Sequence, residues 1–90
     1  MQVEIFRLAS QPIRIEVKDG ASVRDVLDAP GSGKAVGRDD ITLAEAAAEM
    51  YGSVDRLGSF RVDGAPAELD TPVPAGATLL IIPKVEGGRG

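Results

Sequence analysis

The chain of 90 residues contains neither cysteine nor histidine. Without cysteine there can be no disulfide bond, and without both residue types the usual zinc sites are excluded. The lack of histidine removes imidazole acid–base catalysis, so a Ser-His-Asp triad is excluded as well. If this protein takes part in a reaction, we therefore expect the catalytic groups to belong to a partner, and we expect no bound metal.

Aromatic residues, basic charge and long apolar runs are also scarce. Only Phe6, Tyr51 and Phe60 are aromatic, so the core must consist mainly of aliphatic side chains and alanine. The net charge of −4 argues against nucleic acid as a partner, because phosphate binding needs a basic patch. The apolar runs are too short to span a membrane, and the alternating N-terminal residues do not resemble a signal peptide. We expect one cytoplasmic domain.

The N-terminal residues predict a β-hairpin. Residues 3–8 and 13–17 alternate between apolar and polar side chains, a period typical of strands with one buried face. Pro12 stands at the entrance of the second strand, where its missing N–H does least harm. The expected apolar face consists of Val3, Ile5, Ile13, Ile15 and Val17.

Two helices are predicted next. The first covers 22–29, with Ser22 as N-cap, Asp25 as capping-box partner, and Pro30 and Gly31 as the stop signal. Its expected apolar stripe is Val23, Val26 and Leu27.

The second helix begins at a capping box of Thr42 and Glu45 and ends at Gly52 in a left-handed cap. Its expected inner face is Leu43, Ala47, Met50 and Val54.

The glycine-rich segment 31–40 between the helices is predicted to be a mobile loop. It includes "GSGK", which invites comparison with a phosphate-binding loop. The spacing excludes that interpretation, because Asp28 stands where the motif needs glycine and Ala35 where it needs serine or threonine. The adjacent pair Asp39-Asp40 is interpreted as caps of the second helix, which favour the positive end of its dipole, rather than as a metal or acid–base site.

The last third of the sequence has the strongest strand character. "FRV" leads to a turn at Asp63-Gly64, "AEL" (67–69) is expected to return as a short strand, and "TLLII" is apolar enough to lie at the sheet centre. The element order fits an α+β fold of the β-grasp kind, a mixed sheet of four to five strands with helices on one face. We assign residues 1–83 to this domain and 84–90 to a flexible C-terminal tail.

The C-terminal residues supply the chemistry. Gly87 and Gly88 leave the backbone without side chains, so the segment could enter a narrow channel as an extended ribbon. A carboxylate at Gly88 that attacked the α-phosphate of ATP would become an acyl-adenylate, which a sulfur or amine nucleophile could then take up.

Residues 62–88, "VDGAPAELDTPVPAGATLLIIPKVEGG", resemble the end of the MoaD/ThiS-like sulfur carriers among the ubiquitin-like β-grasp proteins. The opening hairpin and the first helix match that family in order, whereas residues 30–57 are longer than its usual connection. The resemblance implies that Gly88 reacts and that Gly87 must precede it because a residue without a side chain is required there. It also implies a recognition stem, formed by Pro83, Lys84, Val85 and Glu86.

The same resemblance implies partners and their cofactor. A ubiquitin-activating-type adenylyltransferase would use ATP to activate Gly88, and this chain would bind no cofactor itself. Because Arg89 and Gly90 follow the glycine pair, a deubiquitinase-like metalloprotease would first remove them. The product would be a thiocarboxylate delivered to a sulfur acceptor enzyme. Two alternatives stay open: a modifier joined to lysines of protein targets, and an adaptor that never reacts.

Overall fold

The computed structural model describes residues 1–7 and 10–83. The elements in chain order are β1 (Gln2–Arg7), β2 (Ile13–Glu16), α1 (Val23–Leu27), the 3-10 helix η1 (Ser32–Val36), α2 (Leu43–Tyr51), the 3-10 helix η2 (Val54–Arg56), β3 (Ser59–Val62), β4 (Ala65–Ala67) and β5 (Thr78–Ile82). Within the described residues, no helix has the length and apolar character needed to cross a membrane.

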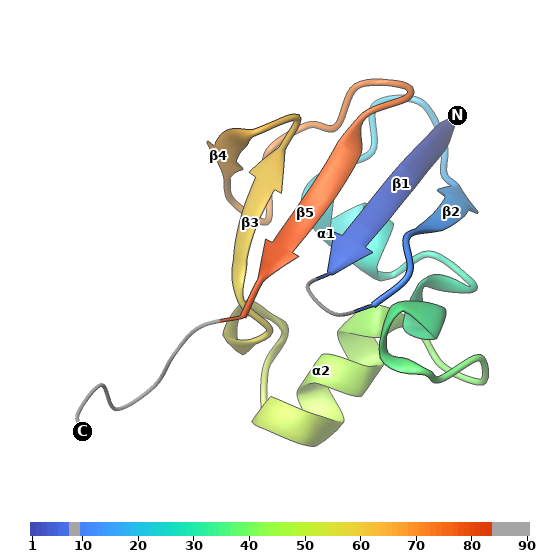
Figure 1. Cartoon of the computed structure of the whole chain (residues 1–90), viewed down its shortest axis with the longest axis vertical. Coiled ribbons are helices and arrows are strands. Elements are labelled where there is room, and N and C mark those ends of the chain that lie inside the picture. Colours follow the sequence, from blue (N-terminus) through green and yellow to red (C-terminus); the bar gives the residue numbers. More distant parts are fainter. Residues whose placement is uncertain (8–9, 84–90) are drawn as a thin grey trace.

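The five strands form one mixed sheet in the order β2-β1-β5-β3-β4 (Figure 1). β5 is parallel to β1 and antiparallel to β3, and both hairpins are antiparallel. The prediction that "TLLII" lies at the sheet centre is therefore confirmed. A central strand is covered on its inner face, which explains why Leu79 and Ile81 are fully buried.

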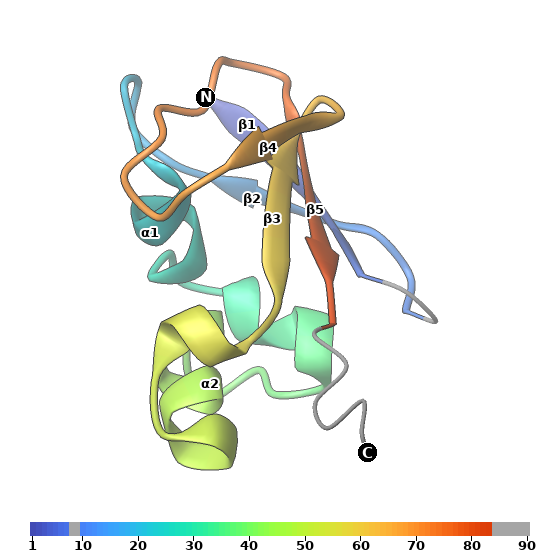
Figure 2. The ribbon, with the colours of Figure 1, turned by 90° about the vertical axis from the view of Figure 1, so that its left-hand side faces the viewer.

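The helices lie on one side of the sheet, with α1 beside the strands and α2 towards the end where β5 finishes (Figure 2). Both capping boxes are present as predicted, Ser22 with Asp25 and Thr42 with Glu45. Gly52 ends α2 in the left-handed conformation, with φ of 92°. The protein therefore has an α+β fold of the β-grasp kind.

The inner face of α2 differs from its prediction at Met50. Leu43, Ala46 and Ala47 are buried, whereas Met50 is 50% exposed. The buried positions follow i, i+3 and i+4, and the helix then extends past the core, so its last turn meets solvent. Val54 is only partly buried and belongs to η2 rather than to a continuation of α2.

The short return strand begins earlier than predicted. β4 covers Ala65–Ala67 instead of 67–69. Asp63 and Gly64 both have positive φ, 50° and 88°, as in the tight two-residue turn that joins antiparallel strands directly. Pairing therefore starts at once, with Ala65 opposite Val62. Pro66 is tolerated because β4 is an edge strand.

The segment predicted to be a mobile loop is instead built into the core. Ser32, Gly33 and Ala35 of η1 are buried. The Ser32 hydroxyl donates to the Leu27 carbonyl oxygen at 2.9 Å and accepts from the Leu43 amide at 2.8 Å. Because these two bonds join the end of α1 to the start of α2, η1 fixes how the helices are arranged.

Candidate functional site

The predicted reactive segment follows β5 directly. Pro83, the last described residue, is exposed and has no N–H with which to continue the ladder. The other predicted site residues lie outside the described residues: Lys84, Val85, Glu86, Gly87, Gly88, Arg89 and Gly90. What the structure does define is the end of the sheet from which this segment departs.

Two neighbouring strands finish together at that end. β1 and β5 are parallel, and Arg7 pairs with Ile81, so the last residues of both strands lie side by side. We call this the exit end, defined by Arg7 of β1 and Ile82 of β5. Because β5 is the central strand and pairs with both β1 and β3, the sheet and not a loop fixes the position of Ile82.

Gly58, just before β3, packs closely against the end of β5. A Cβ atom at Gly58 would lie only 2.3 Å from the Ile82 carbonyl oxygen, a distance that no side chain could occupy. The segment before β3 therefore approaches the end of β5 backbone to backbone, which only glycine permits. The pairing of Ser59 with Ile82 continues this contact into the ladder.

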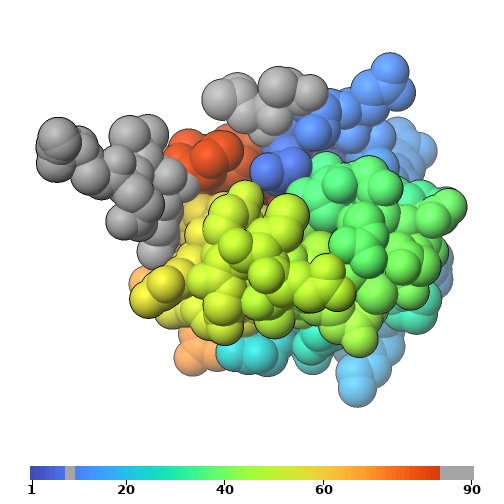
Figure 3. Space-filling view, turned by 90° about the horizontal axis from the view of Figure 1, so that it is seen from below, coloured from blue at the N-terminus to red at the C-terminus, as the bar shows by residue number. Residues whose placement is uncertain are grey.

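Exposed apolar side chains gather around the exit end. Among the described residues, the exposed large hydrophobic side chains are Phe6, Met50, Tyr51 and Ile82. Phe6 and Ile82 belong to the two strands that finish there, while Met50 and Tyr51 form the last turn of α2. Figure 3, a view from below, shows the end of β5, the end of β1 and α2 on one face of the molecule.

A hollow of about 620 Å³ lies beside the exit end. Its walls are the end of β1, the stretch 10–13, η1 and the last turn of α2, and its lining includes Arg7, Ile13, Lys34, Val36, Met50 and Tyr51. The sequence analysis missed this hollow. Its walls come from three separate segments, and the pattern of any one of them shows no sign of the others.

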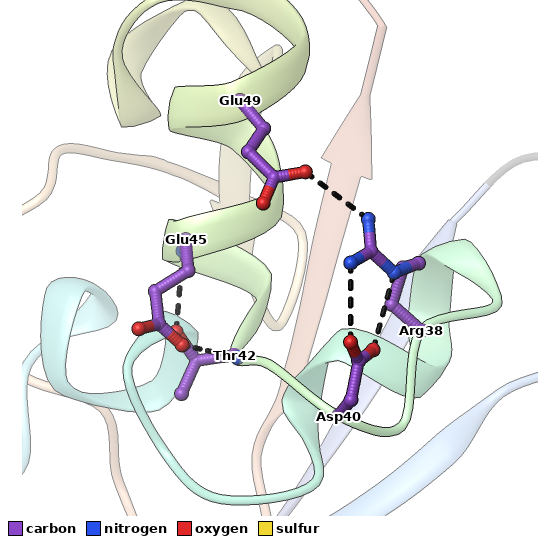
Figure 4. A network of polar contacts seen from close by, with 5 residues as sticks. All are labelled: Arg38, Asp40, Thr42, Glu45 and Glu49. Atoms are coloured by element: carbon purple, nitrogen blue, oxygen red, sulfur yellow. Dashed lines mark hydrogen bonds and ion pairs between the residues drawn. The ribbon is translucent and has the colours of Figure 1, made fainter.

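Asp40, one of the two acidic residues before α2, takes part in an ion-pair network. Arg38 binds Asp40 through two hydrogen bonds of 3.1 and 3.2 Å and reaches Glu49 at 3.2 Å (Figure 4). These hydrogen bonds from Arg38 lower the pKa of Asp40. Thr42, not the acidic pair, caps the helix, so the predicted role of Asp39-Asp40 is corrected.

The described residues offer no arrangement for metal chemistry. No group of three or more carboxylates or other metal-binding side chains comes together in residues 1–7 and 10–83. The Arg38 network is exposed, and exposed ion pairs contribute little to stability because water and salt screen them. It tethers the connection after η1 to the outer side of α2.

These observations define the fold class: the chain has a ubiquitin-like β-grasp fold, as its resemblance to the MoaD/ThiS-like carriers implies. Among solved structures it is similar to SAMP1 from Haloferax volcanii, a ubiquitin-like small archaeal modifier protein. The TM-score is 0.70 with 25% sequence identity, over 98% of this chain and 100% of that one. No protein-family model and no curated protein matches the sequence.

Proposed function

We propose that this protein is a ubiquitin-like carrier whose C-terminal carboxylate, at Gly88, is activated by adenylation and then converted into a thiocarboxylate. The observation that carries the proposal is the position of β5. It is the central strand of a β-grasp sheet, and it leads directly into a segment that contains Gly87 and Gly88. The similarity to SAMP1 over the whole domain supports a carrier or modifier rather than an enzyme.

The proposed chemistry needs a free carboxylate at Gly88, so Arg89 and Gly90 must leave first. A metalloprotease of the deubiquitinase kind would hydrolyse the bond between Gly88 and Arg89. The carboxylate oxygen would then attack the α-phosphorus of ATP and release pyrophosphate, which leaves a mixed anhydride with AMP. Hydrosulfide would attack the carbonyl carbon and expel AMP, so that a C–S bond replaces the C–O bond of the anhydride and leaves the thiocarboxylate.

The stem residues Pro83, Lys84, Val85 and Glu86 would hold the segment in the partner's channel, and Gly87 and Gly88 would pass its narrowest part. Gly88 is the sixth residue after Ile82, so an extended chain can carry the carboxylate about 20 Å beyond the sheet. That reach allows the folded domain to stay outside the enzyme's nucleotide site while its end reacts.

The test is the Gly88→Ala variant of a chain that ends at residue 88. We expect it to melt like the parent, because Gly88 lies beyond the last strand. Its rate of ATP–pyrophosphate exchange with the activating enzyme of its own host should fall more than tenfold, or more than about 1.4 kcal/mol in the transition state, because a methyl group obstructs a channel shaped for glycine. Equal rates for parent and variant would contradict activation at Gly88 and favour the adaptor alternative.

A second candidate function is supported by the name of SAMP1, a modifier protein. In that case the amine of a target lysine, instead of sulfur, would attack the activated carbonyl and form an isopeptide bond. Intact-mass and peptide spectrometry on protein recovered from its host separates the two fates. We expect a species that ends at Gly88 with one carboxylate oxygen replaced by sulfur. Lysine-linked Gly88 without that species would favour the modifier, and only full-length chains would contradict processing.

A further inference from the structure

The hollow beside the exit end is lined in part by basic and apolar side chains. The chain as a whole is acidic, with a net charge of −4, yet the described residues that line the hollow include two cations, Arg7 and Lys34, and no carboxylate. Exposed apolar surface lies next to these cations, with Met50 at 50% and Tyr51 at 41% exposure. A cationic, apolar concavity on an acidic protein suits a partner of opposite charge.

The guanidinium of Arg7 has at least one N–H donor without an acceptor among the described residues. Its Nη1 donates to the Ala35 carbonyl oxygen at 3.2 Å, while its buried Nε–H has no acceptor among the described residues. A guanidinium has five N–H donors, and a buried donor without an acceptor is costly. A carboxylate that entered the hollow would add charge-assisted hydrogen bonds to this group.

The acidic side chain nearest along α2 is already engaged. Glu49, the residue before Met50, accepts from Arg38, which also binds Asp40. This network therefore keeps the Glu49 carboxylate committed to Arg38, while Lys34 is exposed and forms no ion pair within the part of the chain that the structure describes. Arg7 and Lys34 can therefore pair with an acidic group of another molecule.

We propose that the hollow is the docking surface for the adenylating enzyme, and that it accepts a segment of that enzyme in which an acidic side chain is flanked by apolar ones. The acid would pair with Arg7 and Lys34, and the apolar side chains would pack on Met50 and Tyr51. This inference rests on the proposed function. It also assigns a role to residues 30–57, which are longer than the corresponding connection in the resembling family: η1 and α2 build two walls of the surface.

The location of the hollow fits this role. Arg7 pairs with Ile81, so the hollow begins one strand away from the point where the reactive segment leaves the sheet. An enzyme that bound in the hollow would contact a rigid surface of the domain, next to the segment on which it acts. Docking and reaction would then depend on different residues, which allows them to be measured separately.

The test uses chains that end at Gly88 and the activating enzyme of the same host, with binding measured by titration calorimetry in the absence of ATP. Lys34→Glu reverses an exposed charge in the hollow, and Met50→Gln removes exposed apolar surface at similar size. We expect Lys34→Glu to raise Kd about tenfold and Met50→Gln to raise it several-fold, with the parent's Kd also rising with salt. At carrier concentrations well below Kd, the exchange rate should fall in both variants in proportion to their loss of affinity.

Two matched controls lie elsewhere. Lys18→Glu makes the same charge change after β2, whose antiparallel pairing with β1 places it at the opposite end of the sheet. Ala48→Gln makes an exposed polar change on α2 outside the hollow. Both should bind like the parent. Parent affinity in Lys34→Glu and Met50→Gln, no binding by the parent, or self-association of the chain that these variants abolish would each overturn the docking surface.

The same data separate the two proposals. If Gly88→Ala binds like the parent but does not support exchange, docking and activation are both upheld and are distinct. If the parent binds and Lys34→Glu weakens it, yet no exchange occurs with any chain, the activation proposal fails and the docking surface stands. If exchange occurs and all variants bind equally, activation stands and the docking surface fails.

Discussion

Ser32 is the residue whose role differs most from its sequence context. It stands in "GSGK", where glycines on both sides suggest an exposed loop, yet its side chain is fully buried. Its hydroxyl satisfies the Leu27 carbonyl and the Leu43 amide at once. Leu43 is the first residue of α2, and the first N–H groups of a helix have no partner within the helix. Thr42 accepts from the Glu45 amide, so Ser32 supplies the acceptor that the Leu43 amide would otherwise lack.

Replacing Ser32 by alanine should therefore destabilise the domain without affecting any predicted reactive residue. The Leu43 amide would be left buried without an acceptor, at a cost of about 1–3 kcal/mol. For a domain of this size each kcal/mol lowers Tm by about 4–8 °C, which thermal melts followed by circular dichroism resolve easily. Ser59→Ala, at an exposed serine of β3, is the control and should leave Tm close to the parent value. Similar Tm values for Ser32→Ala and the parent would contradict the bridging role.

Elements whose signals are local were predicted well from the sequence. Ser22 and Thr42 begin their helices with the expected capping boxes, and the alternation of the first two strands forms the expected hairpin. Each of these features depends on residues that are close together in the chain. The return strand was placed two residues late because pairing begins directly after the tight turn at Asp63-Gly64.

The 3-10 helix η1 could not be predicted because contacts from outside the segment stabilise it. Gly33 lies so close to the later chain that a Cβ atom there would be 2.1 Å from the Ile41 carbonyl oxygen and 2.5 Å from that of Arg38. The glycine is therefore required by close packing and not by mobility. A glycine-rich stretch looks the same in both cases until the path of the chain after it is known.

At the scale of the whole molecule, the sequence predicted the central place of β5 but not the surface around its end. A strand as apolar as "TLLII" is typical of the centre of a sheet, where neighbouring strands and the helices shield it from water. The hollow, by contrast, forms where β1, η1 and α2 meet, and its two cations, Arg7 and Lys34, belong to two stretches that are far apart in the sequence. The candidate reactive residues came from the resemblance of the C-terminal sequence, and Gly87 and Gly88 lie outside the described residues.

Because β5 pairs with both β1 and β3, its inner face joins the two halves of the fold, and a charge placed there should unfold all of it. Ile81 and Ile82 test this as adjacent, identical residues on opposite faces, fully buried and 39% exposed respectively. Ile81→Asp would bury an unpaired carboxylate, at a cost of several kcal/mol or a raised pKa, which is a large part of the total stability of a small domain. Leu80 shares the outer face with Ile82 and is only half-buried.

Urea titrations of Ile81→Asp and Ile82→Asp at neutral pH should therefore diverge. Ile81→Asp should show a transition at much lower urea than the parent, or no folded baseline, whereas Ile82→Asp should lose at most about 1 kcal/mol because its carboxylate can stay hydrated. Circular dichroism and tyrosine fluorescence should report the same midpoint for each variant, since Tyr51 in α2 and the strands would lose structure together. Equal midpoints for the two variants would mean that β5 does not divide the molecule into a buried inner face and a solvated outer one, and separate midpoints for the two probes would mean that α2 unfolds independently of the sheet.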